Sequence, residues 1–445
     1  MYRQSLHRIE FEVVIDPSAS RGAPSVHPVL SRAFAALDEE HVRWCLLRGE
    51  RELNGLGGDI DLLVHDEDRL RSERILVQLG FVPMPAWGRA THHFFLAYDA
   101  GDDLWFKLDA VSALAFGPHA TIETRAAGGV LARRIAADGL WLPAPTDQYW
   151  ALLLHCILDR SAFPPHHAAA LSDLVVRADE DGPLAAWFDR HSPPGWNAKR
   201  AITATRAGAW PTLVDAGRRM LRSEARRSVS QRGLRVGRSV ARRMTKIRKA
   251  LHERGLSVAI MGPDGAGKSS VAGDIGESFY FPVRSIYMGL FSRDRVTGTP
   301  PSGSVEHLTR LAGHLGRQWR GYLEGLGHRL RGRLVVYDRF AYDASLREPR
   351  RSWIGGRVRR WILAHAVPAP DVVVILDAPA DVLYERAGEH DVATLESQRL
   401  AYLRLAERLP NAHVVTTDRS ADEVRRHVIG LIWDKYRASR RGIRA

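Results

Sequence analysis

Cysteine is scarce in this chain, and long apolar runs are absent. Only Cys45 and Cys156 occur among 445 residues, too few for the disulfide framework of a small secreted protein, so we expect a reducing, cytoplasmic location. The opening residues, "MYRQSLHRIEFEVVID", lack the apolar core of a signal peptide. No apolar run reaches the ~18 residues that predict a membrane-spanning helix. The length is sufficient for two or three domains with separate cores.

Lysine is also scarce, and the positive charge is concentrated in one segment. Six of the 64 basic residues are lysine, and the formal net charge is +13. Residues 216–254 hold fourteen Lys/Arg and two Glu, a net charge of 14 − 2 = +12, so the rest of the chain is close to neutral. One helical stripe in this segment is apolar. Its members are Val236, Val240, Met244, Ile247 and Leu251.

We therefore expect residues 216–254 to form a basic helical connector. Peripheral contact with an anionic membrane is the second interpretation, and contact with a nucleic-acid backbone is the third. Aromatic residues are absent from this segment, so stacking on single-stranded bases has no support. The oligomeric state is not predicted.

Residues 31–144 have an α/β pattern, and residues 145–215 a helical one. "SRAFAALDEE" predicts a helix, and "VRWCLLRG", "DIDLLV", "HHFFLAYD" and "LWFKLDAV" predict strands. "RLRSERILVQLGF" predicts an amphipathic helix, with Leu70, Ile75, Leu76 and Leu79 near helical spacing. The helical part opens at "PAPTDQYW", where we expect Thr146 to be the N-cap.

Three aspartates mark a candidate metal site in the first part. Asp59 and Asp61 are two apart on one predicted strand, so both side chains lie on the same face. Asp109 ends a later predicted strand. Converging carboxylates are ligands for Mg²⁺, and burying them without cations is costly. Of the neighbouring His92 and His93, which alternate faces, only one can serve such a site.

With "CLLRGERELNGLGGDIDLLVHDED" and "LGF", this pattern resembles the nucleotidyltransferase superfamily with a polymerase-β-like fold. The resemblance covers about residues 40–115, and implies a mixed sheet completed by the helical subdomain 145–215. It implies that Asp59, Asp61 and Asp109 hold the metals for nucleotidyl transfer. That family has Gly-Ser before the first aspartate, whereas this chain has Arg48-Gly49 without serine. Both an active domain and a non-catalytic one remain open.

Residues 255–440 alternate strands and helices, as in a doubly wound parallel sheet. The predicted strands, which are apolar enough to be buried on both faces, are "LSVAIM", "RSIYMG", "RLVVYD", "DVVVILD" and "AHVVTTD".

"GPDGAGKSS" follows the first of these strands and matches the P-loop pattern G-x-x-x-x-G-K-[ST]. Such a loop points backbone N–H groups at phosphates, and the following helix adds its positive end. The lysine reaches the β- and γ-phosphates, and the next hydroxyl holds Mg²⁺. The predicted ATP-binding residues are Gly262, Gly265, Gly267, Lys268, Ser269 and Ser270.

"LVVYDRF" delivers Asp338 to the carboxyl end of a strand, where open α/β sheets bind ligands. We expect Asp338 to join Ser269 in the Mg²⁺ shell or to orient the attacking oxygen. Arg339 offers a bidentate fork for a second phosphate. Asp264 would repel phosphate if it pointed inward, so we expect it to face a hydroxyl of the acceptor.

"GPDGAGKSS", "YDRF", "PDVVVILDAPADVLYERAGEHD" and "AHVVTTDRSADEVRRHV" together resemble thymidylate kinases and their relatives, over about residues 256–440. The resemblance implies a P-loop nucleoside-monophosphate kinase fold that transfers the γ-phosphoryl of ATP with Mg²⁺. It implies that Asp264 lies near the acceptor sugar, that Asp338 and Arg339 form the family's Asp–Arg pair, and that Arg386 is the lid arginine. "ESQRLAYLRLAERLP" supplies lid contacts through Arg399 and Tyr402, or is a solvated helix.

"GLFSRDRVTGTPPSGSVEHLTR" replaces the more regular acceptor region of that family, so the acceptor can be a nucleotide, a sugar or a glycan intermediate. The sequence thus predicts an ATP- and Mg²⁺-dependent phosphotransferase fused to a nucleotidyltransferase-like domain. Two alternatives are a nucleic-acid end-processing kinase and nucleotidyltransferase, and a nucleotide-sensing scaffold without turnover.

Overall fold

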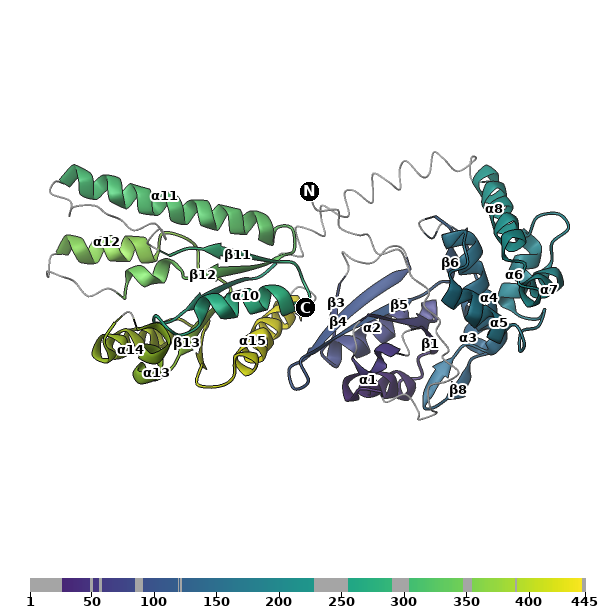
Figure 1. Cartoon of the computed structure of the whole chain (residues 1–445), viewed down its shortest axis with the longest axis horizontal. Coiled ribbons are helices and arrows are strands. Elements are labelled where there is room, and N and C mark those ends of the chain that lie inside the picture. Colours follow the sequence, from purple (N-terminus) through teal and green to yellow (C-terminus); the bar gives the residue numbers. More distant parts are fainter. Residues whose placement is uncertain are drawn as a thin grey trace. The chain divides into compact units, whose positions relative to one another are not determined.

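The computed structural model describes residues 26–48, 51–55, 58–84, 91–118, 120, 122–227, 255–289, 304–346, 354–388 and 390–441. It divides into two compact units (Figure 1). In the described residues, unit 1 comprises 26–99 with 104–227, and unit 2 comprises 100–103 with 255–441. Most of the expected connector, 228–254, lies outside the described residues. Its start, 216–227, belongs to helix α8 (Trp210–Arg227), which runs through the expected boundary at 215 without a break.

Unit 1 is built on a mixed five-stranded sheet with the order β1-β2-β5-β4-β3. Only β2 and β5 pair in parallel, and their register places Asp61 opposite Asp109. The remaining neighbours pair antiparallel. The strands are β1 (Trp44–Arg48), β2 (Asp59–Val64), β3 (Val82–Pro83), β4 (His92–Asp99) and β5 (Leu104–Val111).

Side chains of this sheet alternate between two hydrophobic cores. Trp44, Leu62 and Leu108 belong to the core beneath α1 (Pro28–Glu39) and α2 (Arg69–Gln78). Cys45 and Leu63 belong to a second core, made with the helices that follow residue 145. Because positions two apart on a strand share a face, Asp59 and Asp61 lie on the same face as Leu63, toward the helical part.

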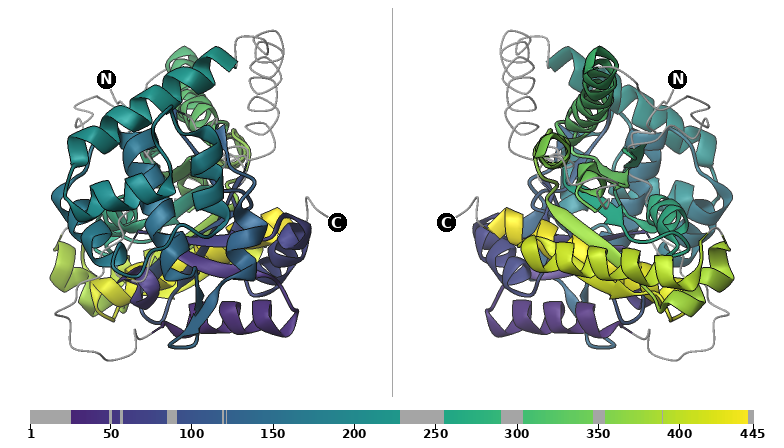
Figure 2. Two further views of the ribbon diagram at one scale, coloured as in Figure 1. Left: turned by 90° about the vertical axis from the view of Figure 1, so that its right-hand side faces the viewer. Right: turned by 90° about the vertical axis from the view of Figure 1, so that its left-hand side faces the viewer.

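The helical part gathers into one group, drawn in teal in Figure 2. Its helices are α4 (Pro145–Leu154), the π-helix η3 (His155–Arg160), α5 (Pro165–Leu174), α6 (Pro183–His191), α7 (Ala198–Arg206) and α8. The expected N-cap was wrong: α4 already begins at Pro145 with Ala144 as its cap. The Thr146 hydroxyl instead accepts a hydrogen bond from the Asp179 amide at 3.4 Å. Proline suits the first helical position because it lacks the N–H that would be unpaired there.

Short elements join the sheet to these helices. They are the hairpins β6 (Ala115–Phe116) with β7 (Ile122–Glu123) and β8 (Ile135–Ala137) with β9 (Leu140–Leu142), and the helix α3 (Ala127–Ala132). The sequence patterns did not predict the two hairpins, because strands of two or three residues are too short to show a periodicity.

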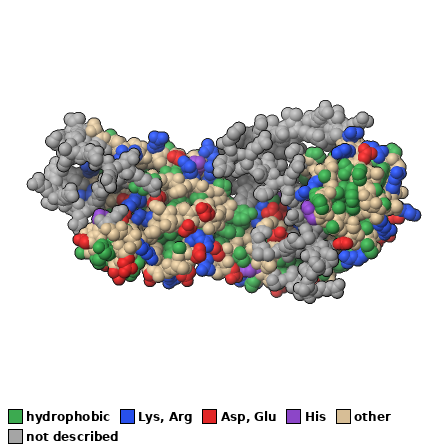
Figure 3. All heavy atoms as spheres, in the orientation of Figure 1, with side chains coloured by type: hydrophobic (Ala, Val, Ile, Leu, Met, Phe, Trp, Pro, Cys, Tyr) green, Lys and Arg blue, Asp and Glu red, His purple; other side chains and the backbone are tan. Residues whose placement is uncertain are grey.

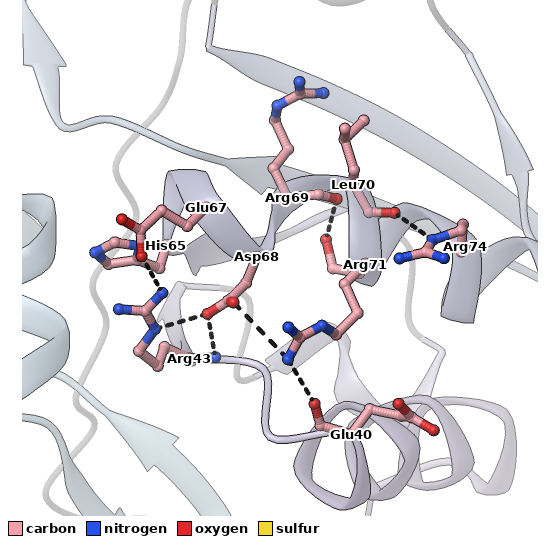
Figure 4. Close-up of polar contacts among 10 residues, drawn as sticks. Glu40, Arg43, His65, Glu67, Asp68, Arg69, Leu70, Arg71 and Arg74 are labelled. Carbon is pink, nitrogen blue, oxygen red and sulfur yellow. Dashed lines mark hydrogen bonds and ion pairs between the residues drawn. The ribbon is translucent and has the colours of Figure 1, made fainter.

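An ionic cluster, rather than apolar spacing, fixes the start of α2 (Figure 4). The Asp68 carboxylate accepts hydrogen bonds from the Arg43 backbone N–H at 3.1 Å and from Arg43 Nε at 2.7 Å. Arg71 lies 4.0 Å from the same carboxylate and donates to the Glu40 carbonyl. Of the four leucines and isoleucines near helical spacing, Ile75 and Leu76 are buried. Leu70 and Leu79 are 58% and 42% exposed. The apolar face that α2 packs against the sheet is therefore narrower than the set of apolar residues at helical spacing.

Unit 2 contains the expected parallel sheet, in the order β11-β12-β10-β13-β14. Its strands are β10 (Ser257–Met261), β11 (Val283–Tyr287), β12 (Leu334–Asp338), β13 (Val372–Asp377) and β14 (Ala412–Thr416). After β10, the chain first forms β11 and β12 on one side of it and then β13 and β14 on the other side. The carboxyl end of β10 therefore lies at the switch point where such sheets bind ligands.

Helices cover both faces of this sheet (Figure 1). α10 (Lys268–Ser278) packs against α15 (Ala421–Arg441) on one face. The other face carries the core that contains Tyr337, Ile375 and Tyr402, where Tyr322 of α11 and Leu405 of α14 also pack. The helices there are α11 (Ser304–Arg329), the short 3₁₀ helix η5 (Ala341–Ala344), α12 (Ile354–Ala364), α13 (Ala380–Ala387) and α14 (Val392–Arg408).

Acidic and basic side chains are interspersed over the part of the surface that Figure 3 draws in colour. No helix among the described residues combines the length and the apolar character that crossing a bilayer requires.

Candidate phosphate-binding site and carboxylate cluster

The loop between β10 and α10 has the backbone of a phosphate cradle. Gly262 has a φ of 147° and Gly265 a φ of 87°, a region that residues with a Cβ rarely adopt. A Cβ on Gly262 would lie 2.5 Å from the Leu376 carbonyl oxygen, and one on Gly265 2.6 Å from the Leu383 carbonyl oxygen. Both positions thus require glycine because of conformation and because of close packing. Gly267, at a φ of 84°, is the residue from which α10 begins.

Lys268 is the first residue of α10 and is buried. Its Nζ donates to the Pro263 carbonyl oxygen at 2.6 Å and lies 3.6 Å from Asp264 Oδ1. Burial lowers the pKa of Lys268 from its ordinary value, and the charge of Arg339 lowers it further. The ammonium is therefore held inside the loop, where a bound phosphate would replace a carbonyl as its partner.

Ser269 and Asp338 meet at the amino terminus of α10. Ser269 Oγ donates to Asp338 Oδ2 at 3.1 Å. Asp338 ends β12, which pairs with β10 so that Ile260 lies opposite Asp338. A hydroxyl and a carboxylate are the hard oxygen ligands that Mg²⁺ prefers, so the donor set fits this ion. Ser270, the next residue, is exposed on the same turn.

Arg339 follows Asp338 and reaches the P-loop acid. Arg339 Nη2 donates to Asp264 Oδ1 at 2.6 Å. Burial raises the pKa of Asp264, but Lys268 and Arg339 outweigh it, so the pKa lies below its ordinary value. We expected Asp264 to face an acceptor hydroxyl. In this structure one oxygen of its carboxylate is bound to Arg339, a partner that we did not expect. Arg339 has a φ of 67°, which is unfavourable for a residue other than glycine.

Arg386 of α13 and Arg399 of α14 contact the carboxyl ends of β14 and β13. Arg386 Nη2 donates to the Thr417 carbonyl at 2.9 Å. Arg399 binds both oxygens of Asp377, at 2.8 and 3.1 Å. The Thr417 amide donates to the Asp377 carbonyl at 2.7 Å. The two arginines thus brace the loop after β14. Arg386 remains our predicted lid arginine, and in this structure its guanidinium is bound to that loop.

The three aspartates of unit 1 lie on one face of its sheet, and each is bound to a basic side chain. Arg48 Nε donates to Asp61 Oδ2. Lys107 Nζ lies 2.7 Å from Asp59 Oδ1, and His92 Nδ1 lies 2.6 Å from Asp109 Oδ2. The structure therefore brings His92 to the carboxylates. The pKa of His93 is lowered by its own burial.

Two oxygens of this cluster lack a partner. Asp61 Oδ1 and Asp109 Oδ1 are buried and accept no hydrogen bond among the described residues. Burial raises the pKa of Asp61, and the charge of Arg48 lowers it in part. Buried oxygens of this kind suit a divalent cation. In the described residues, however, the oxygens of the three aspartates do not all lie within 4.8 Å of one another, so their present spacing is wider than a single ion requires.

No protein-family model matches the chain. Two curated proteins named "Probable thymidylate kinase" are similar to it. The one from Thermococcus gammatolerans is 28% identical over 111 residues, which are 23% of this chain and 51% of the relative. The one from Thermococcus onnurineus is 26% identical over 112 residues, 23% of this chain and 52% of the relative. About a quarter of this chain is homologous to thymidylate kinases.

The chain spans about half the length of these relatives. Among solved structures, thymidylate kinase from Candida albicans is 16% identical, with a TM-score of 0.33, and covers 41% of this chain and 94% of its own.

Sequence reasoning missed Asp343 as a neighbour of Arg339 beside the P-loop. Asp343 lies on η5 with its Oδ2 3.9 Å from Arg339 Nη1. Tyr402 Oη, on α14, donates to Asp343 Oδ1 at 3.0 Å. Burial raises the pKa of Asp343 above its ordinary value, and Arg339 opposes this. The only local signal was an acid five residues after Asp338, which no motif includes.

Proposed function

We propose that unit 2 is an ATP-dependent phosphotransferase of the thymidylate kinase type, acting on a nucleotide, sugar or glycan-type acceptor. The Ser269–Asp338 contact at the amino terminus of α10, next to buried Lys268, carries this proposal. A glycine cradle, a lysine and a hydroxyl–carboxylate pair are the groups that phosphoryl transfer from ATP requires. The homology to thymidylate kinases supports a nucleotide kinase.

Each residue has a role in this proposal. Backbone N–H groups of 262–267 and the amino terminus of α10 bind the β- and γ-phosphates. Lys268 exchanges the Pro263 carbonyl for phosphate oxygens. Ser269 and Asp338 hold Mg²⁺, which neutralises charge on the β- and γ-phosphates when it is bound. Arg339, with Asp264, faces the acceptor, and Arg386 closes over the nucleotide from the edge of β14.

The test is a screen of the full chain with γ-labelled ATP against nucleoside monophosphates, sugars and oligonucleotides. We expect label on one acceptor class, and Lys268→Ala should abolish the transfer. Lys435→Ala is the matched control, because Lys435 is exposed on α15 and has no part in the proposed site. If the protein neither binds ATP with Mg²⁺ nor transfers phosphate, the proposal is wrong.

A second candidate function belongs to unit 1, for which we propose metal-dependent nucleotidyl transfer through Asp59, Asp61 and Asp109. The unpartnered oxygens of Asp61 and Asp109 favour it, since buried carboxylate oxygens without donors are costly unless a cation binds. Such a cation would compete with Arg48, Lys107 and His92 for the carboxylates. Label transfer from α-labelled ATP that is lost in Asp61→Asn would support it. Absence of Mn²⁺ binding in wild-type protein would contradict it.

The nucleic-acid end-processing alternative is not favoured, since the similar proteins are nucleotide kinases by name. Its basic segment lies mostly outside the described residues. Oligonucleotide binding that weakens with salt would revive it.

A further inference from the structure

Three basic side chains converge on the carboxylate of Asp264. Arg339 Nη2 donates to Asp264 Oδ1 at 2.6 Å, and Lys268 Nζ lies 3.6 Å from the same oxygen. His390 Nε2 lies 3.8 Å from the other oxygen, Oδ2. Lys268 and Arg339 belong to recognisable motifs, whereas no motif singled out His390. The acid of the P-loop therefore gathers three groups of a kind that binds phosphate.

His390 reaches this position because the helix before it, α13, packs directly against the P-loop. A Cβ on Gly265 would lie 2.6 Å from the Leu383 carbonyl oxygen and 3.3 Å from the Cβ of Ala387, the last residue of α13. His390 comes shortly after Ala387 and immediately precedes Asp391, the N-cap of α14. The backbone of His390 is therefore placed by the ends of two helices.

The contact between His390 and Asp264 is weak enough to be exchanged. A separation of 3.8 Å is longer than a hydrogen bond, and the His390 side chain is 43% exposed, so solvent screens the attraction. A protonated imidazole has two N–H donors. One of them can stay with the carboxylate while the other binds a second anion.

The phosphate that Lys268 binds can supply this second anion. In a P-loop, backbone N–H groups cradle the β-phosphate, and the lysine reaches on to the γ-phosphate. In this chain Lys268 and His390 lie beside the two oxygens of one carboxylate. A γ-phosphate bound to Lys268 therefore comes close to His390 as well.

The other charges around Asp264 largely offset one another. Lys268 and Arg339 supply two positive charges. Asp264 is an anion because, despite its burial, these two cations hold its pKa below the ordinary value. Asp343, 3.9 Å from Arg339, is a second acid, and burial raises its pKa, so it offsets at most one charge. These four groups together leave the site close to neutral or weakly positive.

The charge of His390 therefore adds to a small net charge, and its protonated form makes the site more attractive to phosphate. Asp391, next to His390 in the chain, accepts a hydrogen bond from the Thr394 N–H at 2.7 Å, which lowers its pKa. That carboxylate is directed to the start of α14. In the part of the chain that the structure describes, the acid in ion-pair contact with His390 is Asp264.

We propose, on the basis of the phosphotransferase function above, that His390 is a further nucleotide-binding residue, whose protonated side chain binds the γ-phosphate and distinguishes ATP from ADP. The convergence of three basic groups on the Asp264 carboxylate carries this assignment. A histidine side chain ordinarily changes its charge between pH 5 and 8. The preference for ATP should therefore be stronger at pH 6 than at pH 8.

The test compares ADP with an ATP analogue whose β–γ bridge is nitrogen, because only the analogue carries a γ-phosphate. Each ligand is titrated by calorimetry into the full chain with Mg²⁺ at pH 6. We expect His390→Ala to weaken analogue binding about tenfold, through loss of a hydrogen bond between charged groups, and to change ADP binding by less than about twofold. His365→Ala is the matched control, because His365 is exposed just after α12 and bonds to the Trp361 carbonyl of that helix.

His390→Arg separates the charge of the side chain from its structural role. Arginine stays protonated at both pH values. This variant should keep its preference for the analogue at pH 8, where wild type should lose about fivefold of its own preference. The comparison also removes the titration of the phosphates themselves, which affects both proteins alike.

Equal weakening of ADP and analogue binding in His390→Ala would overturn the assignment, since it would indicate a structural role. Unchanged binding of both ligands would overturn it too, and so would the same pH response in wild type and His390→Arg. Wild-type binding is measured first. If neither ligand binds wild type with Mg²⁺, the phosphotransferase proposal is wrong. If both bind and His390→Ala leaves the ratio of their affinities unchanged, only the His390 assignment is wrong.

Discussion

Ser269 donates a hydrogen bond over 3.1 Å to Asp338, although 69 residues separate them in the chain. The first turn of α10 and the last residue of β12 are therefore joined through two side chains. Both carry the oxygen ligands that Mg²⁺ prefers. The contact holds these ligands side by side before a nucleotide arrives, which reduces the ordering that binding requires.

Ser269→Ala should weaken ATP binding only when Mg²⁺ is present. Loss of one oxygen ligand should lower ATP affinity about tenfold, or about 1.4 kcal/mol. Calorimetric titration of ATP with Mg²⁺ and with a chelator measures the difference, with Ser172→Ala, an exposed serine of α5 in unit 1, as the control. Equal weakening under both conditions would mean that Ser269 contacts the nucleotide rather than the ion.

Tyr402→Phe should destabilise unit 2. It leaves the Asp343 carboxylate without the hydrogen bond that Tyr402 donates, and an unsatisfied buried acceptor costs about 1–3 kcal/mol. Urea unfolding followed by tryptophan fluorescence measures the change. The control is Tyr384→Phe, because Tyr384 is 47% exposed and its hydroxyl removal should be close to neutral. Equal midpoints for both variants would contradict the prediction.

Asp147→Asn should remove a pH dependence of stability. Asp147 is buried, neither of its oxygens accepts a hydrogen bond from the part of the chain that the structure describes, and Arg133 Nε lies 3.3 Å from Asp147 Oδ2. Burial raises the pKa of Asp147 to about 6 from its ordinary 3.8, against the charge of Arg133.

Between these values the folded chain binds a proton that the unfolded chain releases, so wild-type stability falls as pH rises from about 4 to about 6. Asparagine does not titrate. The stability of Asp147→Asn relative to wild type should therefore be higher at pH 8 than at pH 3.5, by about 1–3 kcal/mol. Urea unfolding at the two pH values measures this. A constant difference would show that folding does not raise the pKa of Asp147.

Arg48→Met should destabilise unit 1 because it leaves Asp61 buried without its cation. Breaking a buried ion pair on one side costs about 3–5 kcal/mol. The double variant Arg48→Met with Asp61→Asn should lose less than the sum of the single losses. Chemical unfolding of all four proteins gives the coupling energy. Additive losses would mean that the pair contributes no interaction of its own.

The parallel sheet of unit 2 was predictable because each strand is a continuous apolar run and the P-loop follows the first one. Asp338 was predictable as a candidate for the same reason: it ends an apolar strand, and parallel strands end at one edge. The contact between Tyr402 and Asp343 was not predictable, since a contact across 59 residues leaves no local pattern. Arg386 contacts the loop after β14, and the spacing of residues in the sequence could not predict that contact either.

In unit 1 the alternation of β2 correctly predicted that Asp59 and Asp61 share a face. The basic partners were not predicted. Lys107 and His92 lie on strands whose order in the sheet, β2-β5-β4, differs from their order in the chain. Leu70 and Leu79 share the helical spacing of Ile75 and Leu76 but are exposed, because periodicity gives the direction of a helix face and not how much of that face is covered.

Arg339 occupies a left-handed backbone conformation, with a φ of 67°. This costs about 1–3 kcal/mol for a residue with a side chain, and glycine would relieve it. The backbone and the side chain of this residue therefore make opposite demands: Arg339→Gly relaxes the backbone while removing the guanidinium that binds Asp264. Glycine would thus exchange a strained backbone for two carboxylates, those of Asp264 and Asp343, without the arginine that lies beside them.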